Sequence, residues 1–109
     1  MMIIEVDELD FKEVLANEFS KGNIVILKFG SMYCDACMAL GFELEELDEK
    51  MDNLSILEID CSDSESLTQM YDIVQVPTMI IYKDANSMIF NAVGVTLAVD
   101  IEKIIKESM

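Results

Sequence analysis

Apolar residues recur along this chain in two patterns, one typical of strands and one typical of helices. Short runs rich in Ile, Val and Leu predict strands, whereas apolar stripes spaced three and four residues apart predict helices. Five strands are expected, at residues 2–6, 24–30, 54–60, 78–83 and 88–93. Four helices are expected, at 11–20, along the stripe Leu40, Leu44, Leu47 and Met51, along the stripe Leu67, Met70, Tyr71 and Val74, and from residue 97 to near the end.

The predicted elements follow the order β-α-β-α-β-α-β-β-α. Strands that alternate with helices indicate crossover connections and a parallel sheet. The last two strands are separated only by the short turn at 84–87, so they are expected to pair antiparallel. The sequence therefore predicts an α/β fold in one domain, 1–109, with a five-stranded mixed sheet and four helices on its two faces. Asp10 is expected to cap the first helix.

The charge balance narrows the classes of partner. Seven basic and 22 acidic residues give a net charge of −15, which disfavours nucleic acid and anionic membrane surfaces. The acids concentrate at 43–52 and 58–65, where we expect solvated faces, with steering toward a basic partner as the alternative. No apolar run reaches the roughly 20 residues of a membrane span, and the first residues do not resemble a secretory signal. We therefore expect a cytoplasmic location.

Cys34 and Cys37 lie two residues apart, between a buried strand and an amphipathic helix. Unpaired N–H groups at a helix N-terminus stabilise negative charge, and a thiolate is the nucleophile in disulfide exchange. The spacing predicts a redox pair in which Cys34 attacks a substrate disulfide and Cys37 resolves the mixed disulfide. The third cysteine, Cys61, is expected to fill space, with regulatory oxidation or dimerisation as the alternative.

Several features of the chain together carry a resemblance to a known family. They are "YCDAC" at 33–37, "VPT" at 76–78 and Gly94 before the last helix. With these features the chain resembles the thioredoxin family over essentially its whole length. The resemblance implies the thioredoxin fold and a cis Val76–Pro77 bond. It implies that Val76 and Pro77 bind the substrate backbone as an added strand, with Tyr33 at the border of the site.

The same resemblance implies the activity and the partners. We expect a protein-disulfide reductase that acts on disulfide-containing proteins and takes electrons from a reductase or a small thiol. No bound cofactor and no metal are implied, and a monomer is expected.

Two residues depart from the family pattern. Asp35 places a carboxylate beside Cys34, and this charge opposes a second negative charge on the thiol. Asp35 therefore predicts a less acidic Cys34 and a reduction potential typical of a reductase. Lys28 stands where the family keeps a buried aspartate that is regarded as a proton relay. If buried, Lys28 could exchange protons near neutral pH or favour a thiolate at Cys37. The alternative is that it extends to the surface or pairs with Asp60.

Three other functions remain open from the sequence. A cysteine-based metal site is one, although structural zinc sites take four ligands and the chain has no histidine. A non-catalytic binding module on the same fold is the second. A thiol oxidase working outside the cytoplasm is the third, and the first residues argue against it.

Overall fold

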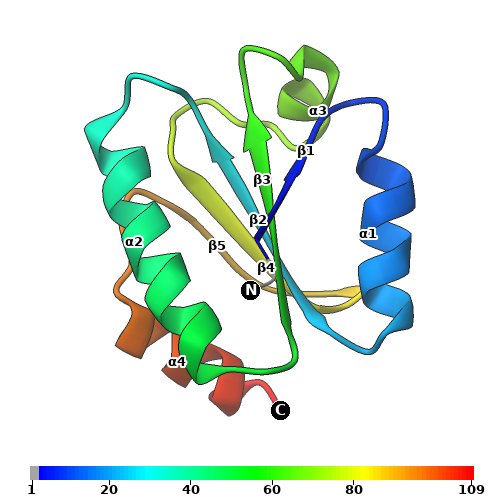
Figure 1. Cartoon of the computed structure of the whole chain (residues 1–109), viewed down its shortest axis with the longest axis vertical. Helices are drawn as coiled ribbons and strands as arrows, with labels where there is room; N and C mark the ends of the chain where they lie inside the picture. Colours follow the sequence, from blue (N-terminus) through cyan, green and yellow to red (C-terminus); the bar gives the residue numbers. More distant parts are fainter. Residues whose placement is uncertain (1–2) are drawn as a thin grey trace.

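The computed structural model describes residues 3–109 and contains the predicted element order (Figure 1). The strands are β1 (Ile3–Val6), β2 (Ile24–Gly30), β3 (Leu54–Asp60), β4 (Thr78–Asp84) and β5 (Ser87–Val93). The helices are α1 (Phe11–Ser20), α2 (Asp35–Lys50), α3 (Glu65–Met70) and α4 (Ala98–Glu107). Residue 2, expected in the first strand, lies outside the described residues.

The strands form one mixed sheet in the order β1-β3-β2-β4-β5. β1, β3 and β2 run parallel, whereas β4 pairs antiparallel with β2 and with β5. The predicted α/β fold with a five-stranded mixed sheet is confirmed. β2 lies at the centre, so its carboxyl end is flanked by the end of β3 and by the start of β4.

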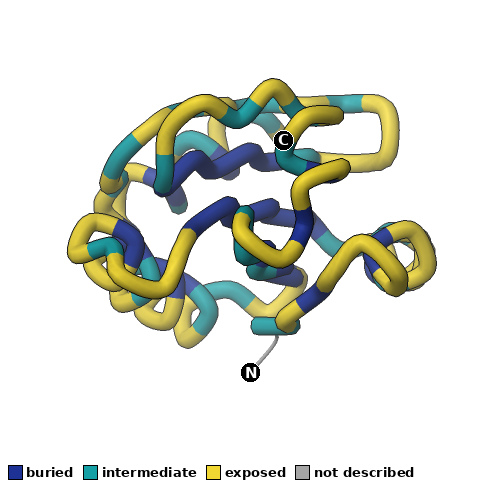
Figure 2. The backbone as a smooth tube through the Cα atoms, turned by 90° about the horizontal axis from the view of Figure 1, so that it is seen from above, coloured by how far each residue is buried: buried dark blue, intermediate teal, exposed yellow. Residues whose placement is uncertain are grey.

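Two apolar clusters cover the two faces of the sheet. α2 and α4 pack on one face, where Leu40, Leu44 and Ile101 meet Ile24 and Ile26 of β2. α1 and α3 pack on the other face, against the alternate residues of the same strand. Figure 2 shows the buried segments as a central layer between largely exposed helices. β2 is buried along its whole length, and the cysteine pair follows its buried end.

One local prediction was wrong, and another holds for the position of the residue but not for its side-chain bond. The third helix ends at Met70, and Val74 lies beyond it with 88% of its surface exposed, so Val74 is not part of an apolar helix stripe. Asp72 interrupts the segment with a φ of +56°, which does not continue a right-handed helix. At α1, Asp10 does occupy the N-cap position, but its carboxylate accepts a hydrogen bond from the N–H of Asp7 and makes no cap bond.

A buried carboxylate ties α1 to the sheet. Glu18 accepts hydrogen bonds from Ser55 Oγ at 2.7 Å and from Lys21 Nζ at 2.8 Å. Burial by itself would raise the pKa of Glu18, but the hydrogen bonds from Lys21 and Ser55 outweigh it and lower the pKa below its ordinary value of 4.5. The ionised form therefore stabilises the folded state.

Glu18→Gln is expected to destabilise the fold in a pH-dependent way. Because the folded pKa is lowered, the contribution of Glu18 is present above pH 4.5 and is lost as the pH falls through the folded pKa. At neutral pH the variant should lose about 1.5–3 kcal/mol, the usual contribution of hydrogen bonds to a charged group. Urea unfolding of both proteins at several pH values checks this, and a difference that does not shrink in acid contradicts it.

Candidate active site

The cysteine pair lies at the N-terminus of α2, just beyond the end of β2. Cys34 is the N-cap residue with extended backbone, at φ −136° and ψ 105°. A disulfide joins it to Cys37, with 5.2 Å between the two Cα atoms. Cys34 is half-buried, whereas Cys37 is 4% exposed. An attacking thiol from another protein can therefore reach Cys34 more easily than Cys37.

The backbone at the helix start favours negative charge on Cys34. The N–H of Cys37 donates to Cys34 Sγ at 3.1 Å. Free N–H groups and the helix dipole at this end of α2 act in the same direction. Asp35, the exposed first residue of α2, acts in the opposite direction because its carboxylate is negative. Tyr33 precedes the pair and is 98% exposed.

A loop with a cis peptide bond lies next to the carboxyl end of β2, the end that leads to the cysteine pair. The Val76–Pro77 bond is cis, and the sheet register places Thr78 opposite Phe29, one residue before β2 ends. Pro77 is buried and Val76 is half-buried. The carbonyl oxygen of Pro77 accepts a hydrogen bond from Gly94 N at 2.8 Å, and Gly94 has a φ of +92°, which a glycine adopts without cost.

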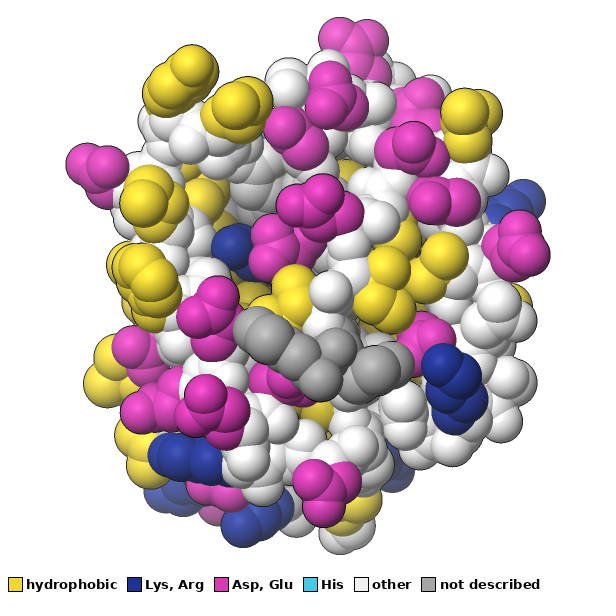
Figure 3. Space-filling model, viewed as in Figure 1, with side chains coloured by type: hydrophobic (Ala, Val, Ile, Leu, Met, Phe, Trp, Pro, Cys, Tyr) yellow, Lys and Arg dark blue, Asp and Glu magenta, His cyan; other side chains and the backbone are white. Residues whose placement is uncertain are grey.

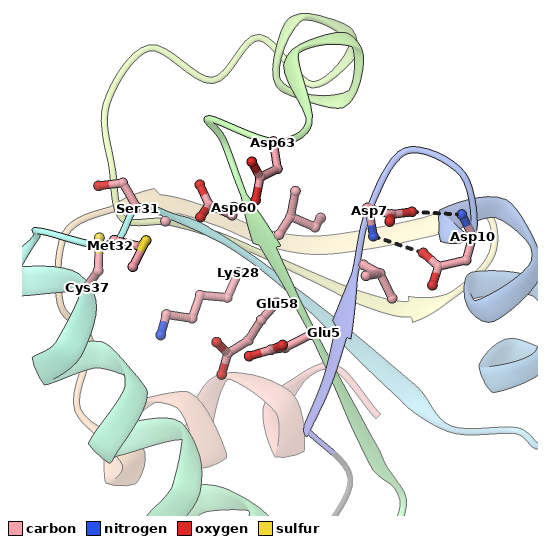
Figure 4. A pocket seen from close by; sticks show the side chains of 13 residues that line it. Glu5, Asp7, Asp10, Lys28, Ser31, Met32, Cys37, Glu58, Asp60 and Asp63 are labelled. Carbon is pink, nitrogen blue, oxygen red and sulfur yellow. Dashed lines mark hydrogen bonds between the residues drawn. The ribbon is translucent and has the colours of Figure 1, made fainter.

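A cavity of about 490 Å³ opens behind the cysteine pair (Figure 4). Its lining residues come from β1, β2, β3, the start of α2 and the loops that follow these strands. They are Glu5, Val6, Asp7, Asp10, Lys28, Gly30, Ser31, Met32, Cys37, Glu58, Ile59, Asp60 and Asp63. In Figure 3 acidic side chains border a hollow on this face, with apolar side chains along the side of α2. The cavity joins the less exposed cysteine to a strongly acidic surface.

Comparison with known proteins identifies the family. The family model described as Thioredoxin matches residues 2–107. The chain belongs to the thioredoxin family. Thioredoxins from Bacillus subtilis and Staphylococcus epidermidis are 31% and 27% identical over 85 residues, which is 77% of this chain and 77% of each relative. Together with the disulfide between Cys34 and Cys37, membership shows that the chain is a protein thiol–disulfide oxidoreductase.

Solved thioredoxin structures agree with the fold. Chloroplastic thioredoxin z superposes with a TM-score of 0.85 at 26% identity, over 98% of this chain and 94% of the other. The reduced thioredoxin of Schistosoma mansoni has a TM-score of 0.82 at 24% identity and full coverage of both chains. The second comparison bears on the fold alone.

Lys28, the main departure from the thioredoxin pattern, is buried with 8% of its surface exposed. Among the described residues it makes no hydrogen bond or ion pair, so the alternatives of a surface position or a pair with Asp60 are wrong. Asp60 Oδ1 instead accepts bonds from the N–H and the hydroxyl of Ser62. The register places Lys28 opposite Glu58, and Asp60 opposite Gly30.

Sequence reasoning missed Glu58 and the two glycines beside the site. A Cβ at Gly30 would lie 3.4 Å from Cys37 Sγ, and one at Gly41 would lie 3.0 Å from Lys28 Nζ. These glycines make room for the thiol and for the amine. The position of Glu58 could have been found from the alternation of side chains along its strand. Leu54, Ile56 and Glu58 are two residues apart in turn and therefore lie on the same face, the one that α2 covers.

Cys61 takes no part in the disulfide. It is free and half-buried, and it lines a second cavity of about 240 Å³ together with Val74 and Val76. Within residues 3–109, no three Cys, Asp or Glu side chains are placed to share a metal ion. No helix in that same stretch has both the length and the apolar character to cross a membrane.

Proposed function

We propose that the chain reduces protein disulfides, with Cys34 as the attacking and Cys37 as the resolving residue. The asymmetry of the pair carries this proposal: Cys34 is the more exposed, and its sulfur accepts an N–H at the start of α2. The Cys34 thiolate attacks a substrate disulfide and releases one substrate thiolate. Cys37 then attacks Cys34 Sγ, which forms the Cys34–Cys37 disulfide and releases the second substrate thiolate.

Tyr33, Val76 and Pro77 form the proposed substrate-binding surface. Val76 and Pro77 lie beside the end of β2, and Tyr33 is almost fully exposed next to Cys34. The backbone N–H and C=O groups of Val76 would pair with an extended substrate segment, and the ring of Tyr33 would cover its side. This arrangement would orient a substrate disulfide toward Cys34.

The partners and setting follow from the family and the charge. A reductase or a small thiol would return two electrons to the disulfide. We propose a single domain over 1–109, a monomer in the cytoplasm, with neither nucleic acid nor membrane as partner. The net charge of −15 supports the last point.

Two charged residues would adjust the thiols. Lys28 is buried behind Cys37, where a positive charge favours a thiolate. Asp35 adjoins Cys34 and opposes a thiolate there. The two residues would therefore act on different sulfur atoms.

Asp35→Asn is expected to speed the attack of Cys34 on a disulfide at neutral pH. Removal of the neighbouring negative charge raises the thiolate fraction, and for exposed charges we expect a two- to fivefold effect, corresponding to about 0.5–1 kcal/mol. The absorbance of the thiolate as a function of pH measures the thiolate fraction. Glu46→Gln, an exposed change further along α2, is the control. Unchanged thiolate fractions would remove Asp35 from the tuning of Cys34.

Trapping of the mixed disulfide tests the proposed roles. In a Cys61→Ser background, reduced Cys37→Ser should form a stable adduct with oxidised insulin that peptide mapping places on Cys34. Cys34→Ser should form none, and dithiothreitol should release the adduct. An adduct that forms equally well on Cys37 when Cys34 is absent would reverse the assignment.

A further inference from the structure

Three charged residues form a row across one face of the sheet. Glu5 of β1 is opposite Glu58 of β3, and Glu58 is opposite Lys28 of β2. Side chains opposite one another in a sheet lie on the same face. This face is the one covered by α2, because Ile26 and Ile56, two residues earlier on their strands, pack against that helix. The row therefore places three charged side chains next to the apolar layer that contains Ile26 and Ile56.

The ammonium group of Lys28 lies close to the resolving cysteine. Its Nζ is against α2 at Gly41, where a Cβ would be 3.0 Å away. Cys37 precedes Gly41 by four residues and so lies on the same side of the helix, one turn nearer its start. Lys28 and Cys37 line the same cavity, and Lys28 has no ion-pair partner within the described chain.

Glu58 lies between this buried region and solvent. Glu58 is half-buried. Of its neighbours in the row, Lys28 is buried and Glu5 is exposed. In Figure 4 the side chains of Lys28, Glu58 and Glu5 all point toward α2 into the cavity. The carboxylate of Glu58 thus faces the water-accessible space that reaches Cys37.

The reaction requires a proton to move at this place. Cys37 must lose its thiol proton to resolve the mixed disulfide, but it is only 4% exposed. The cavity is the open route from its sulfur, and Glu58 is the carboxylate of the row next to Lys28.

We propose that Glu58 exchanges the proton of Cys37 through water in this cavity, and that Lys28 stabilises the thiolate left behind. The inference rests on the proposed function and names the groups that drive its second step. The Cys37 thiol gives its proton through water to the Glu58 carboxylate. The thiolate attacks Cys34 Sγ, the bond between Cys34 and the substrate sulfur breaks, and the substrate leaves as a thiolate. Glu58 then returns the proton to solvent.

Other ionisable groups face Glu58 and belong in the pH analysis. Glu5 and Asp7 come from β1 and its end, Lys28 from β2 and Asp60 from β3. The loops add Asp10 and Asp63, and α2 contributes Cys37 to the lining. Only Lys28 is positive, so it is the group in this lining that favours a thiolate at Cys37.

Ellman's reagent separates the two chemical steps. With reduced protein in a Cys61→Ser background, attack by Cys34 releases one aryl thiolate and attack by Cys37 on the mixed disulfide releases the second. Glu58→Gln should leave the first phase unchanged and slow the second at least about tenfold at neutral pH, the lower range for positioned acid–base groups. Lys28→Met should also slow the second phase.

Asp63→Asn is the matched control, because it removes one negative charge from the same cavity at a position outside the row. It should leave both phases near wild type. If it slows the second phase as much as Glu58→Gln does, the effect is one of net charge and the proposal is overturned. An unchanged second phase in Glu58→Gln also overturns it. A missing first phase in the wild type would instead refute the proposed function.

The pH profile and chemical rescue distinguish proton exchange from a structural role. The second phase of the wild type should vary little between about pH 6 and 8, whereas that of Glu58→Gln should rise in proportion to hydroxide. Sodium formate should restore the second phase of Glu58→Gln relative to sodium chloride at equal ionic strength. A variant profile parallel to that of the wild type, without rescue by formate, would contradict the proposal.

Discussion

Cys34→Ser is expected to abolish the reduction of protein disulfides by this chain. The hydroxyl of serine is a far weaker nucleophile than a thiolate, and Cys37 is too buried to replace Cys34 in the attack on a substrate. Loss of a nucleophile typically lowers turnover by at least about a thousandfold. Insulin reduction with dithiothreitol as the electron donor measures the effect.

Cys61→Ser is the matched control for this experiment. It makes the same chemical change at a half-buried cysteine outside the disulfide, so turnover should remain near wild type. Turnover that survives in Cys34→Ser, or that is lost in Cys61→Ser, would show that the working thiol has been misassigned.

Phe29→Ala is expected to be the most destabilising single change considered for the fold. Phe29 is fully buried in the central strand, and its ring centroid is 5.5 Å from that of Tyr71. Truncation of a buried aromatic residue costs about 3–5 kcal/mol, through lost transfer free energy and the cavity that remains. A domain of this size has only about 5–15 kcal/mol of stability. Urea denaturation should show a large fall in the midpoint.

The same change at Phe42 serves as the control. Phe42 lies on α2 and is 64% exposed, so Phe42→Ala removes little buried surface. We expect a change within about 0.5 kcal/mol. If the two variants lose similar stability, the burial of Phe29 is not what stabilises the central strand.

Neighbouring residues of β2 serve the fold and the site separately. Phe29 faces the cluster under α1 and α3, whereas Lys28 faces the cavity under α2. Strand alternation places them on opposite sides of the sheet. Changes at Lys28 can therefore be made for mechanistic tests without removing apolar contacts from the cluster that contains Phe29.

The fold was predictable because its pattern is local and strong. Strand 24–30 is a continuous apolar run, which indicates a central strand covered on both faces, and it is buried throughout. The third helix was predicted too long because apolar residues near helical spacing continued past its end. The positive φ of Asp72 prevents the helix from continuing to Val74. A residue other than glycine in this conformation leaves no clear signal in the sequence.

The sequence by itself determined the element order and the position of Cys34 and Cys37 between a strand and a helix. These follow from spacing along the chain, which one sequence records directly. The resemblance to the thioredoxin family came from the motif residues at 33–37 and 76–78 and from Gly94. Only the tertiary structure decided that Lys28 is buried beside Cys37 and opposite Glu58 rather than paired with Asp60. That outcome depends on the register of β2 and β3, whose facing residues Lys28 and Glu58 are about thirty residues apart in the sequence, and on the space left by Gly41. A one-residue shift in register would have placed other side chains together.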